Sequence, residues 1–243
     1  PPSREELSAV CRRMAARGPD GEGIWQSTDG RVLLGHRRLA VIDPSLDAAQ
    51  PMQSPDRRFT ISFNGEIYNH AALRARLEHR GHRFRSASDT EVLLALFTEY
   101  GESCCAMLEG MYAFAVHDRA TQSLFLARDP YGIKPLYYAE ERGTIRFASQ
   151  ARALGAGRAD NPAGLVGFAL LGHVPDPLTI FSGVKALEAG HGIWVRKGRV
   201  ERPFSHGSIT GEFGRDQVPT PDLETICRTA LRESLSLHLV SDV

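Results

Sequence analysis

Apolar residues spaced three and four positions apart predict helices along this chain. The first helix opens at Ser3, which together with Glu6 has the spacing of a capping box, and its apolar stripe consists of Leu7, Val10, Cys11, Met14 and Ala15. Two more helices are predicted over residues 70–80 and 88–101, and Glu91 completes a second capping box at the start of the latter.

Strands are predicted between and beyond these helices. Residues 31–42 read as extended, and Phe59, Ile61 and Phe63 alternate with polar residues as in a half-buried strand. The Asn64-Gly65 pair that follows has the chemistry of a turn between strands. Three hairpins are predicted farther on, pairing 111–116 with 123–127, 136–139 with 144–148, and 192–195 with 199–201. Because hairpins pair antiparallel and the helices come in blocks, we expect an α+β fold and not a doubly wound parallel sheet.

The end of the chain differs from the rest in composition and in its apolar pattern. Residues 203–220 are rich in Gly, Ser, Thr and charge without an apolar period, which predicts a linker. An amphipathic helix is expected from Pro221, with an apolar stripe of Leu223, Ile226, Cys227, Ala230 and Leu231. The pattern therefore divides the chain into a domain over 1–202, a linker over 203–220 and a helix within 221–243.

Composition narrows the possible functions. The 243 residues are 42% hydrophobic and 24% charged with a formal net charge of zero, so no charged field points to nucleic acid or a membrane surface. No apolar run is long enough to span a bilayer and no leader opens the chain, which predicts a cytoplasmic protein. The four cysteines have no metal-ligand spacing, so we expect reduced thiols and no metal, with Cys11 a small buried apolar residue.

Asn64 and Gly65 are the first candidates for chemistry. An Asn-Gly pair between strands is most often only a type I′ hairpin turn. The alternative is that the Asn64 carboxamide and the Gly65 backbone N–H point the same way, as two donors to a tetrahedral oxyanion do.

Two charged residues could bind an amino acid. The stretch over residues 35–43 carries Arg37 and Arg38 among apolar residues. An α-carboxylate could match the charge of an arginine in this stretch, although such an arginine could also reach solvent at a strand end. Asp89 begins a helix, where the helix dipole favours a carboxylate, and it could also receive an α-ammonium group. A cation, an anion and a donor pair together describe a site for cleaving an amide on an amino acid.

Five motifs in order resemble those of the class II glutamine amidotransferases, and their spacing resembles the asparagine synthetase branch. The motifs are Arg17-Gly18-Pro19-Asp20, Gly35-His36-Arg37-Arg38-Leu39, Phe63-Asn64-Gly65-Glu66-Ile67-Tyr68-Asn69, Ser88-Asp89-Thr90-Glu91 and Arg128-Asp129-Pro130-Tyr131-Gly132-Ile133-Lys134-Pro135-Leu136-Tyr137-Tyr138. The resemblance covers residues 17 to 191, and extends more loosely to Val243.

The resemblance implies a fold and a set of roles. The fold is the N-terminal-nucleophile (Ntn) hydrolase fold, a four-layer αββα sandwich with two stacked antiparallel sheets between helices. Asn64 and Gly65 would form the oxyanion hole. L-Glutamine would be bound by Arg38 at its α-carboxylate, by Asp89 and Glu66 at its α-ammonium, and by backbone contacts at Leu39, Val41 and Ile42.

The sequence departs from the family pattern in two places. The family nucleophile is an N-terminal cysteine on a strand ahead of the first helix, whereas this chain begins at that helix, and Cys11 is on its buried face. We therefore expect the 243 residues alone to lack glutaminase activity and to show a gap near Asn64. The family also carries Phe-Ala-Ser-Glu where this chain has Phe147-Ala148-Ser149-Gln150, so the role of that last position is open.

What the resemblance implies for the whole protein goes beyond this chain. Residues 221–243 would begin a synthetase domain, linked in cis, that uses ATP and magnesium to activate aspartate for ammonia, while the first domain needs no cofactor. A homodimer is a further candidate assembly. Two alternatives remain at this point: an amidotransferase acting on another carboxylate acceptor, and a non-catalytic domain that keeps the fold as a scaffold.

Overall fold

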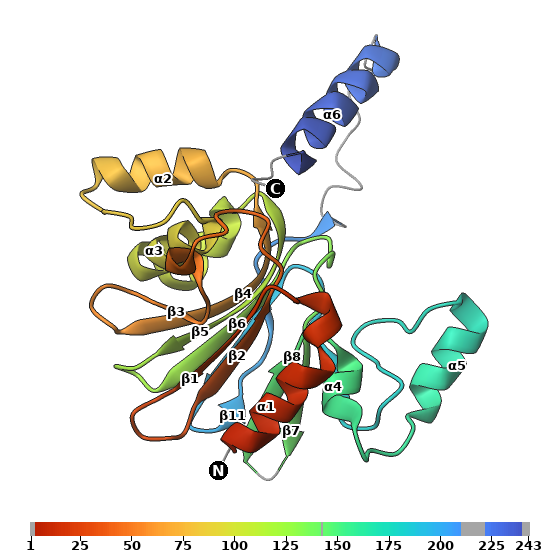
Figure 1. The fold of residues 1–243 in the computed structure, drawn as a ribbon. Coiled ribbons are helices and arrows are strands. Elements are labelled where there is room, and N and C mark those ends of the chain that lie inside the picture. The colour runs from red at the N-terminus through yellow and green to blue at the C-terminus, as the bar shows by residue number, and fades with distance from the viewer. Residues whose placement is uncertain (1–2, 142, 210–221, 240–243) are drawn as a thin grey trace.

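The computed structural model describes residues 3–141, 143–209 and 222–239, and it separates helices from antiparallel strands (Figure 1). The helices are α1 (Arg4–Arg13), α2 (His70–His79), α3 (Asp89–Tyr100), α4 (Ala151–Gly155), α5 (Pro162–Leu171) and α6 (Leu223–His238), with 3₁₀ turns at Ala15–Arg17, Leu46–Ala48 and Gly101–Met107. Within the described ranges, no helix combines the length and apolarity needed to cross a bilayer.

The strands form one large sheet and two small ones, and every strand pair is antiparallel. The large sheet consists of β3 (Met52–Gln53), β4 (Phe59–Ile67), β5 (Gly110–Asp118), β6 (Ser123–Arg128), β10 (His191–Arg196), β11 (Arg199–Val200) and β12 (Phe204–Ser205). Six of these strands follow the order β11-β10-β6-β5-β4-β3, and the seventh, β12, also pairs with β10. The small sheets are β1 (Gly21–Gln26) with β2 (Leu33–Arg38), and β8 (Thr144–Ala148) with β7 (Tyr137–Glu141) and β9 (Val184–Ala186).

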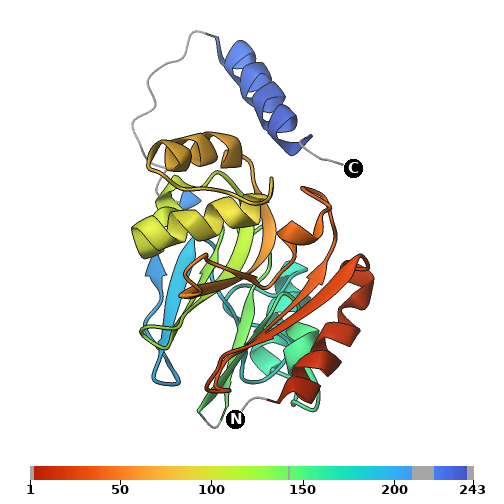
Figure 2. The ribbon, with the colours of Figure 1, turned by 60° about the vertical axis from the view of Figure 1, so that its left-hand side comes forward.

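The elements are stacked in layers (Figures 1 and 2), and three clusters of buried apolar side chains lie between these layers. The first lies between α2, α3 and the large sheet, and includes Leu96 and Phe114. The second lies between the large sheet and the two small sheets, and includes Leu126 and Leu34. The third joins β7–β9 to α4 and α1, around Leu154. Helices therefore cover the outer faces of two stacked sheet layers, because each sheet has two faces to bury.

The three predicted hairpins and the two middle helices are present, but the turn predicted at Asn64-Gly65 is wrong. Both residues lie inside β4, which pairs with β5 without interruption from Phe59 to Ile67. A glycine is needed at position 65 because of a contact with the neighbouring strand. A Cβ atom there would lie 2.2 Å from the carbonyl oxygen of Met111 on β5. Close packing of the neighbouring backbone, and not a change of chain direction, accounts for this glycine.

Two further predictions near the start of the chain need correction. The extended segment expected over 31–42 is a strand only from Leu33 to Arg38, and it pairs with β1, which the apolar pattern did not reveal. Ser3 occupies the N-cap position of α1 but its side chain makes no cap hydrogen bond, so the first capping box does not form. In contrast, Ser88 accepts from the backbone N–H of Glu91 at 3.3 Å and caps α3.

The segment predicted as a linker, residues 203–220, begins with a strand. Because β12 (Phe204–Ser205) pairs with β10, the expected domain boundary at residue 202 falls before the last strand of the large sheet. Most of the predicted linker lies outside the described residues. Helix α6 is present, and its apolar stripe is exposed, with Leu223 66% and Leu231 65% accessible. The ring of His238 on α6 lies 4.7 Å from that of Tyr68 at the end of β4.

Candidate functional site

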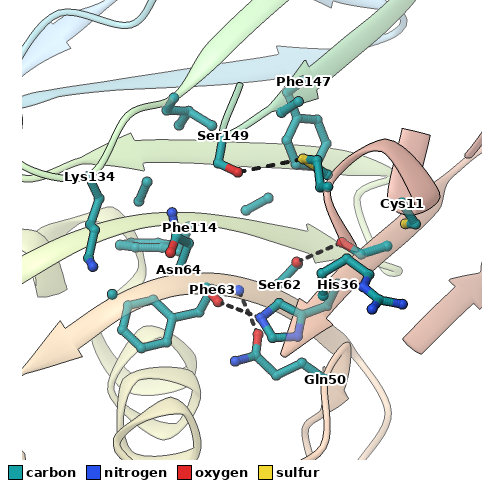
Figure 3. Close-up of a pocket in the computed structure, with 18 of the residues that line it drawn as sticks. Cys11, His36, Gln50, Ser62, Phe63, Asn64, Phe114, Lys134, Phe147 and Ser149 are labelled. Atoms are coloured by element: carbon teal, nitrogen blue, oxygen red, sulfur yellow. Dashed lines mark hydrogen bonds between the residues drawn. The ribbon is translucent and has the colours of Figure 1, made fainter. Parts of the chain in front are cut away.

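The eight residues selected from the sequence all line one cavity of about 380 Å³ between the two sheet layers (Figure 3). They come from the end of β2 and the segment after it, from β4 and from the first turn of α3: Arg38, Leu39, Val41, Ile42, Asn64, Gly65, Glu66 and Asp89. Arg38 and Asp89, far apart in the sequence, thus reach the same space. Gln150 does not line the cavity, whereas its neighbour Ser149 does.

Strand β4 supplies the polar side of the cavity. Its odd-numbered residues Phe59, Ile61 and Phe63 belong to the apolar cluster under the helices. Successive side chains on a strand point to opposite faces, so Asn64 and Glu66 face the cavity. Among the described residues the Asn64 carboxamide has no hydrogen-bond partner, which leaves its N–H groups available to a ligand.

Two carboxylates lie deep in this cavity. Glu66 is 8% exposed, and its Oε1 atom is buried without a hydrogen-bond partner. Asp89 is 5% exposed, and its Oδ2 accepts from the backbone N–H of Ile67 at 3.0 Å. Burial raises the pKa of both groups, and the Asp89 charge adds to the effect on the pKa of Glu66. A buried carboxylate oxygen with no partner is costly, so this site favours a cationic ligand.

Arg38 is held at the end of β2 by the loop that follows it. Its guanidinium donates to the carbonyl oxygens of Ser45, at 2.8 Å, and Asp43. Asp43 in turn has a positive φ of 50° and accepts from the backbone N–H of Ala87, just before α3. These bonds orient the guanidinium, and its charge also acts on the Asp43 carboxyl group, whose pKa is lowered by the hydrogen bond from Ser45 and, less strongly, by Arg38.

His36 and Gln50 are cavity residues that the sequence did not assign to a site. The Nε2–H of His36 donates to the carbonyl oxygen of Phe63 at 3.1 Å, and burial lowers the pKa of this histidine to about 4. The Gln50 carboxamide accepts from the Phe63 N–H at 2.7 Å and donates to Thr90 Oγ1 at 3.1 Å. Both side chains anchor β4 to other elements beside Asn64. His36 lies in a recognised motif, whereas no local signal marks Gln50.

Two strand edges also line the cavity. Among the described residues, β2 pairs only with β1 and β8 pairs only with β7, so each has an edge without a partner strand. Residues from both strands border the cavity, including Gly35 of β2 and Phe147 of β8. Unpaired strand edges present backbone donors and acceptors to an extended peptide. The cavity beside Asn64 is thus bordered by these two strand edges, whereas Phe59, Ile61 and Phe63 are buried in the apolar cluster on the other face of β4.

Three of the four cysteines lie away from the cavity, and Cys11 borders it. Cys104 and Cys105 lie in the apolar cluster between the helices and the large sheet. Cys227 is on exposed α6. Cys11 borders the cavity, but Figure 3 shows it on the opposite side of the cavity from Asn64. Burial raises the pKa of the Cys11 thiol, and the Glu22 carboxylate raises it further. A less ionised thiol is a weaker nucleophile.

Comparison with known proteins places this arrangement in a sequence family. The model of the glutamine amidotransferase domain family matches residues 1–205. The chain is 36% identical over 250 residues to a glutamine-hydrolysing asparagine synthetase of Bacillus subtilis, covering 99% of this chain and 38% of that protein. It is 33% identical to asparagine synthetase B of Escherichia coli, again over 99% of this chain and 38% of the relative.

Solved structures agree on the fold. The glutamine phosphoribosylpyrophosphate amidotransferase of B. subtilis aligns with a TM-score of 0.59 at 22% identity, covering 83% of this chain and 46% of that chain. An allosteric regulatory enzyme of purine biosynthesis aligns with a TM-score of 0.53 at 23% identity, covering 72% and 35%. The α+β, four-layer Ntn hydrolase sandwich expected from the sequence is confirmed. On the match over residues 1–205, this chain belongs to the glutamine amidotransferase domain family.

Proposed function

We propose that the cavity binds L-glutamine and that the chain is the glutamine-hydrolysing portion of an asparagine synthetase. The observation that carries the proposal is the pairing, in one cavity, of the Arg38 guanidinium with the buried carboxylates of Glu66 and Asp89. A free amino acid carries both an α-carboxylate and an α-ammonium, and these groups match that pairing. The unpartnered oxygen of Glu66 would gain its missing donor from the ammonium.

The other end of glutamine would lie over β4. Its carboxamide oxygen becomes an oxyanion when a nucleophile adds to the carbon, and the Asn64 side chain and Gly65 N–H would donate to that oxygen. Leu39, Val41 and Ile42 line the same cavity and would contact the substrate through their backbone. Replacing Gly65 would displace the β5 backbone beside it, so the glycine keeps this donor pair in place.

The nucleophile would be the thiolate of an N-terminal cysteine on an extended segment between the edges of β2 and β8. The thiolate adds to the carboxamide carbon, its own α-amine relays a proton to the departing nitrogen, and ammonia leaves as a thioester forms. Water then adds to the thioester, releasing glutamate and the thiol. The support is the pair of free strand edges in the cavity, together with the positions of the four cysteines.

Ammonia would pass to a second domain that ATP and magnesium serve, where aspartate is activated as an acyl-adenylate. The asparagine synthetases matched here are longer than this chain, which spans 38% of their length. Among the described residues, no group of three or more His, Cys, Asp or Glu could hold a metal ion. We assign ATP and magnesium to that second domain, of which α6 (Leu223–His238) would be the first helix.

Activity of the full-length protein tests the proposal. The Asp89→Asn variant removes the charge and keeps an acceptor for the Ile67 N–H, so the fold should persist. We expect glutamine-dependent asparagine formation to fall by about 10- to 100-fold, the effect of losing a charge-assisted hydrogen bond, while synthesis from added ammonia is unchanged. Asp56→Asn, an exposed carboxylate in the turn between β3 and β4, is the matched control.

The same assay separates the alternatives. Glutamate release without asparagine, together with amidation of a different carboxylic acid, would identify another acceptor. If the full-length protein releases no glutamate at all, the domain is a non-catalytic scaffold. If Asp89→Asn lowers ammonia-dependent synthesis equally, the assignment of Asp89 to the substrate ammonium is wrong.

A further inference from the structure

The loop after β6 is fixed by hydrogen bonds out to Lys134. The buried Asp129 carboxylate accepts from four backbone N–H groups, those of Tyr112, Tyr131, Ile133 and Lys134, at 2.9–3.3 Å. Arg128 donates to the carbonyl oxygens of Gly132 at 2.8 Å and Lys134 at 3.0 Å. Both backbone groups of Lys134 are therefore anchored, and a residue held in this way presents its side chain in a defined direction.

The side chain of Lys134 enters the cavity proposed for glutamine. It lines the cavity and is half-buried, and Figure 3 shows it reaching from its loop toward Asn64 and Phe63. Within the described residues, no carboxylate lies within ion-pair distance of its ammonium. Burial lowers the pKa of Lys134, while the carboxylates of Glu66 and Asp129 raise it and Arg17 lowers it. An anchored cation without a contacting anion is unusual for a purely structural lysine.

Glu66 is the anionic group that this charge acts upon. Besides burial, the pKa of Glu66 is raised by Asp89 on α3 and lowered by Lys134, by His238 on α6 and by His70 on α2. Tyr68, at the end of the same strand, is a further titratable group close to Glu66. Among these neighbours, Lys134 lowers the pKa of Glu66 the most.

We propose that Lys134 is a positioning residue of the glutamine site, whose ammonium keeps the buried Glu66 carboxylate ionised and ready for the α-ammonium of the substrate. The proposal rests on the proposed function, because it takes glutamine as the ligand. Lys134 and Arg38 are among the cations that line the cavity, and Glu66 and Asp89 are among its anions. Without Lys134, the Asp89 charge would act on the buried Glu66 carboxylate with less compensation, so Glu66 would take up a proton at a higher pH.

The affinity of the 243-residue chain for L-glutamine as a function of pH tests this role. In Lys134→Met, we expect the pH below which affinity falls to move upward by about one unit, so that the Kd is about tenfold higher than that of wild type at mildly acidic pH and recovers as pH rises. Lys134→Arg, which keeps the charge, should restore the wild-type profile. Lys185→Met, an exposed lysine on β9, is the matched control.

The outcomes distinguish a failure of the Lys134 proposal from a failure of the proposed glutamine site. If the wild-type chain and its variants bind no glutamine at any pH, the glutamine site itself is wrong. If wild type binds and Lys134→Met weakens binding equally at every pH, Lys134 is structural and the proposal is overturned. The carboxyl carbon resonance of Glu66, followed by NMR without ligand, gives an independent reading. Its midpoint should move to higher pH in Lys134→Met, and an unchanged midpoint would contradict the proposal.

Discussion

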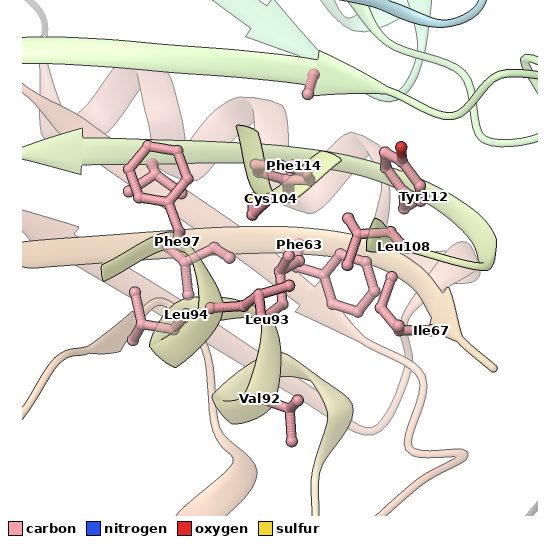
Figure 4. Close-up of a cluster of buried hydrophobic side chains, with 14 of the residues drawn as sticks. Phe63, Ile67, Val92, Leu93, Leu94, Phe97, Cys104, Leu108, Tyr112 and Phe114 are labelled. Carbon is pink, nitrogen blue, oxygen red and sulfur yellow. The ribbon is translucent and has the colours of Figure 1, made fainter. Parts of the chain in front are cut away.

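The two faces of the large sheet have the same strands but opposite character. The face toward α2 and α3 is filled by a continuous apolar cluster that includes Phe63, Phe97 and Phe114 (Figure 4). The face toward the small sheets is apolar only in part, and around Asn64 and Glu66 it opens into the cavity. One strand, β4, contributes to both faces through its two-residue alternation.

The difference shows how the domain separates stability from recognition. The helix face excludes water with closely packed side chains and carries most of the apolar burial. The cavity face contains buried charges and an unpartnered carboxylate oxygen, features that cost stability and are retained where a ligand supplies the missing partner. Changes on the first face should therefore affect folding, and changes on the second should affect binding or the response to pH.

The largest expected effect is on the helix face. Phe97 on α3 is 2% exposed, and its ring contacts those of Phe59 and Phe125 at centroid distances of 5.6 and 5.5 Å. Phe97→Ala should lower the free energy of unfolding by about 3–5 kcal/mol, the cost of a cavity left by a large side chain. Urea unfolding measures it, with the exposed Phe168→Ala on α5 as control. Equal losses in both variants would show that this cluster does not carry the stability.

A smaller effect is expected on the cavity face, as a response to pH. Because burial lowers the pKa of His36 to about 4 from its usual 6.5, the unfolded chain binds more protons below pH 6.5. Stability from this residue is therefore complete above pH 6.5 and is lost as pH falls toward 4, by up to about 3 kcal/mol.

The His36 contribution can be isolated by a difference measurement. Burial raises the pKa of Glu66 and Asp89, so these groups favour the folded state as pH falls and oppose the histidine. Thermal or urea unfolding of wild type and His36→Asn, repeated between pH 7 and 4, cancels their effect. The stability difference between the two proteins should shift in favour of the variant as pH falls. A difference that stays constant would show that His36 has an ordinary pKa.

The smallest expected effect is at the N-terminus of α3, which contributes Phe97 to one face and Asp89 to the other. Ser88 caps this helix through the N–H of Glu91. Ser88→Ala should lower the free energy of unfolding by about 1 kcal/mol. Ser3→Ala is the matched control, because Ser3 occupies the same position on α1 without making the bond. Similar losses in both variants would mean that the difference between these two caps has no energetic consequence.

Much of the fold follows from signals that operate within a few residues. Periodicity and caps identified α2 and α3, and turn residues identified three hairpins. The order of the motifs identified the family and selected Arg38, Asn64, Gly65 and Asp89, which the structure places around one cavity. In these cases local chemistry and tertiary structure favour the same outcome.

Other features were decided only when distant segments came together. The Asn64-Gly65 pair has the local chemistry of a turn, but pairing along the whole of β5 holds it in a strand, and the carbonyl of Met111 explains the glycine. The missing hydrogen bond of Glu66 and the approach of Lys134 depend on burial and on contacts between residues far apart in sequence. The sequence by itself thus determined the family and the locally encoded elements, among them α2, α3 and the three hairpins. Tertiary structure alone decided which charged side chains meet in the cavity, because these residues are far apart in the chain. It also decided the direction of their pKa shifts, because a pKa depends on the burial of the group and on the charges around it.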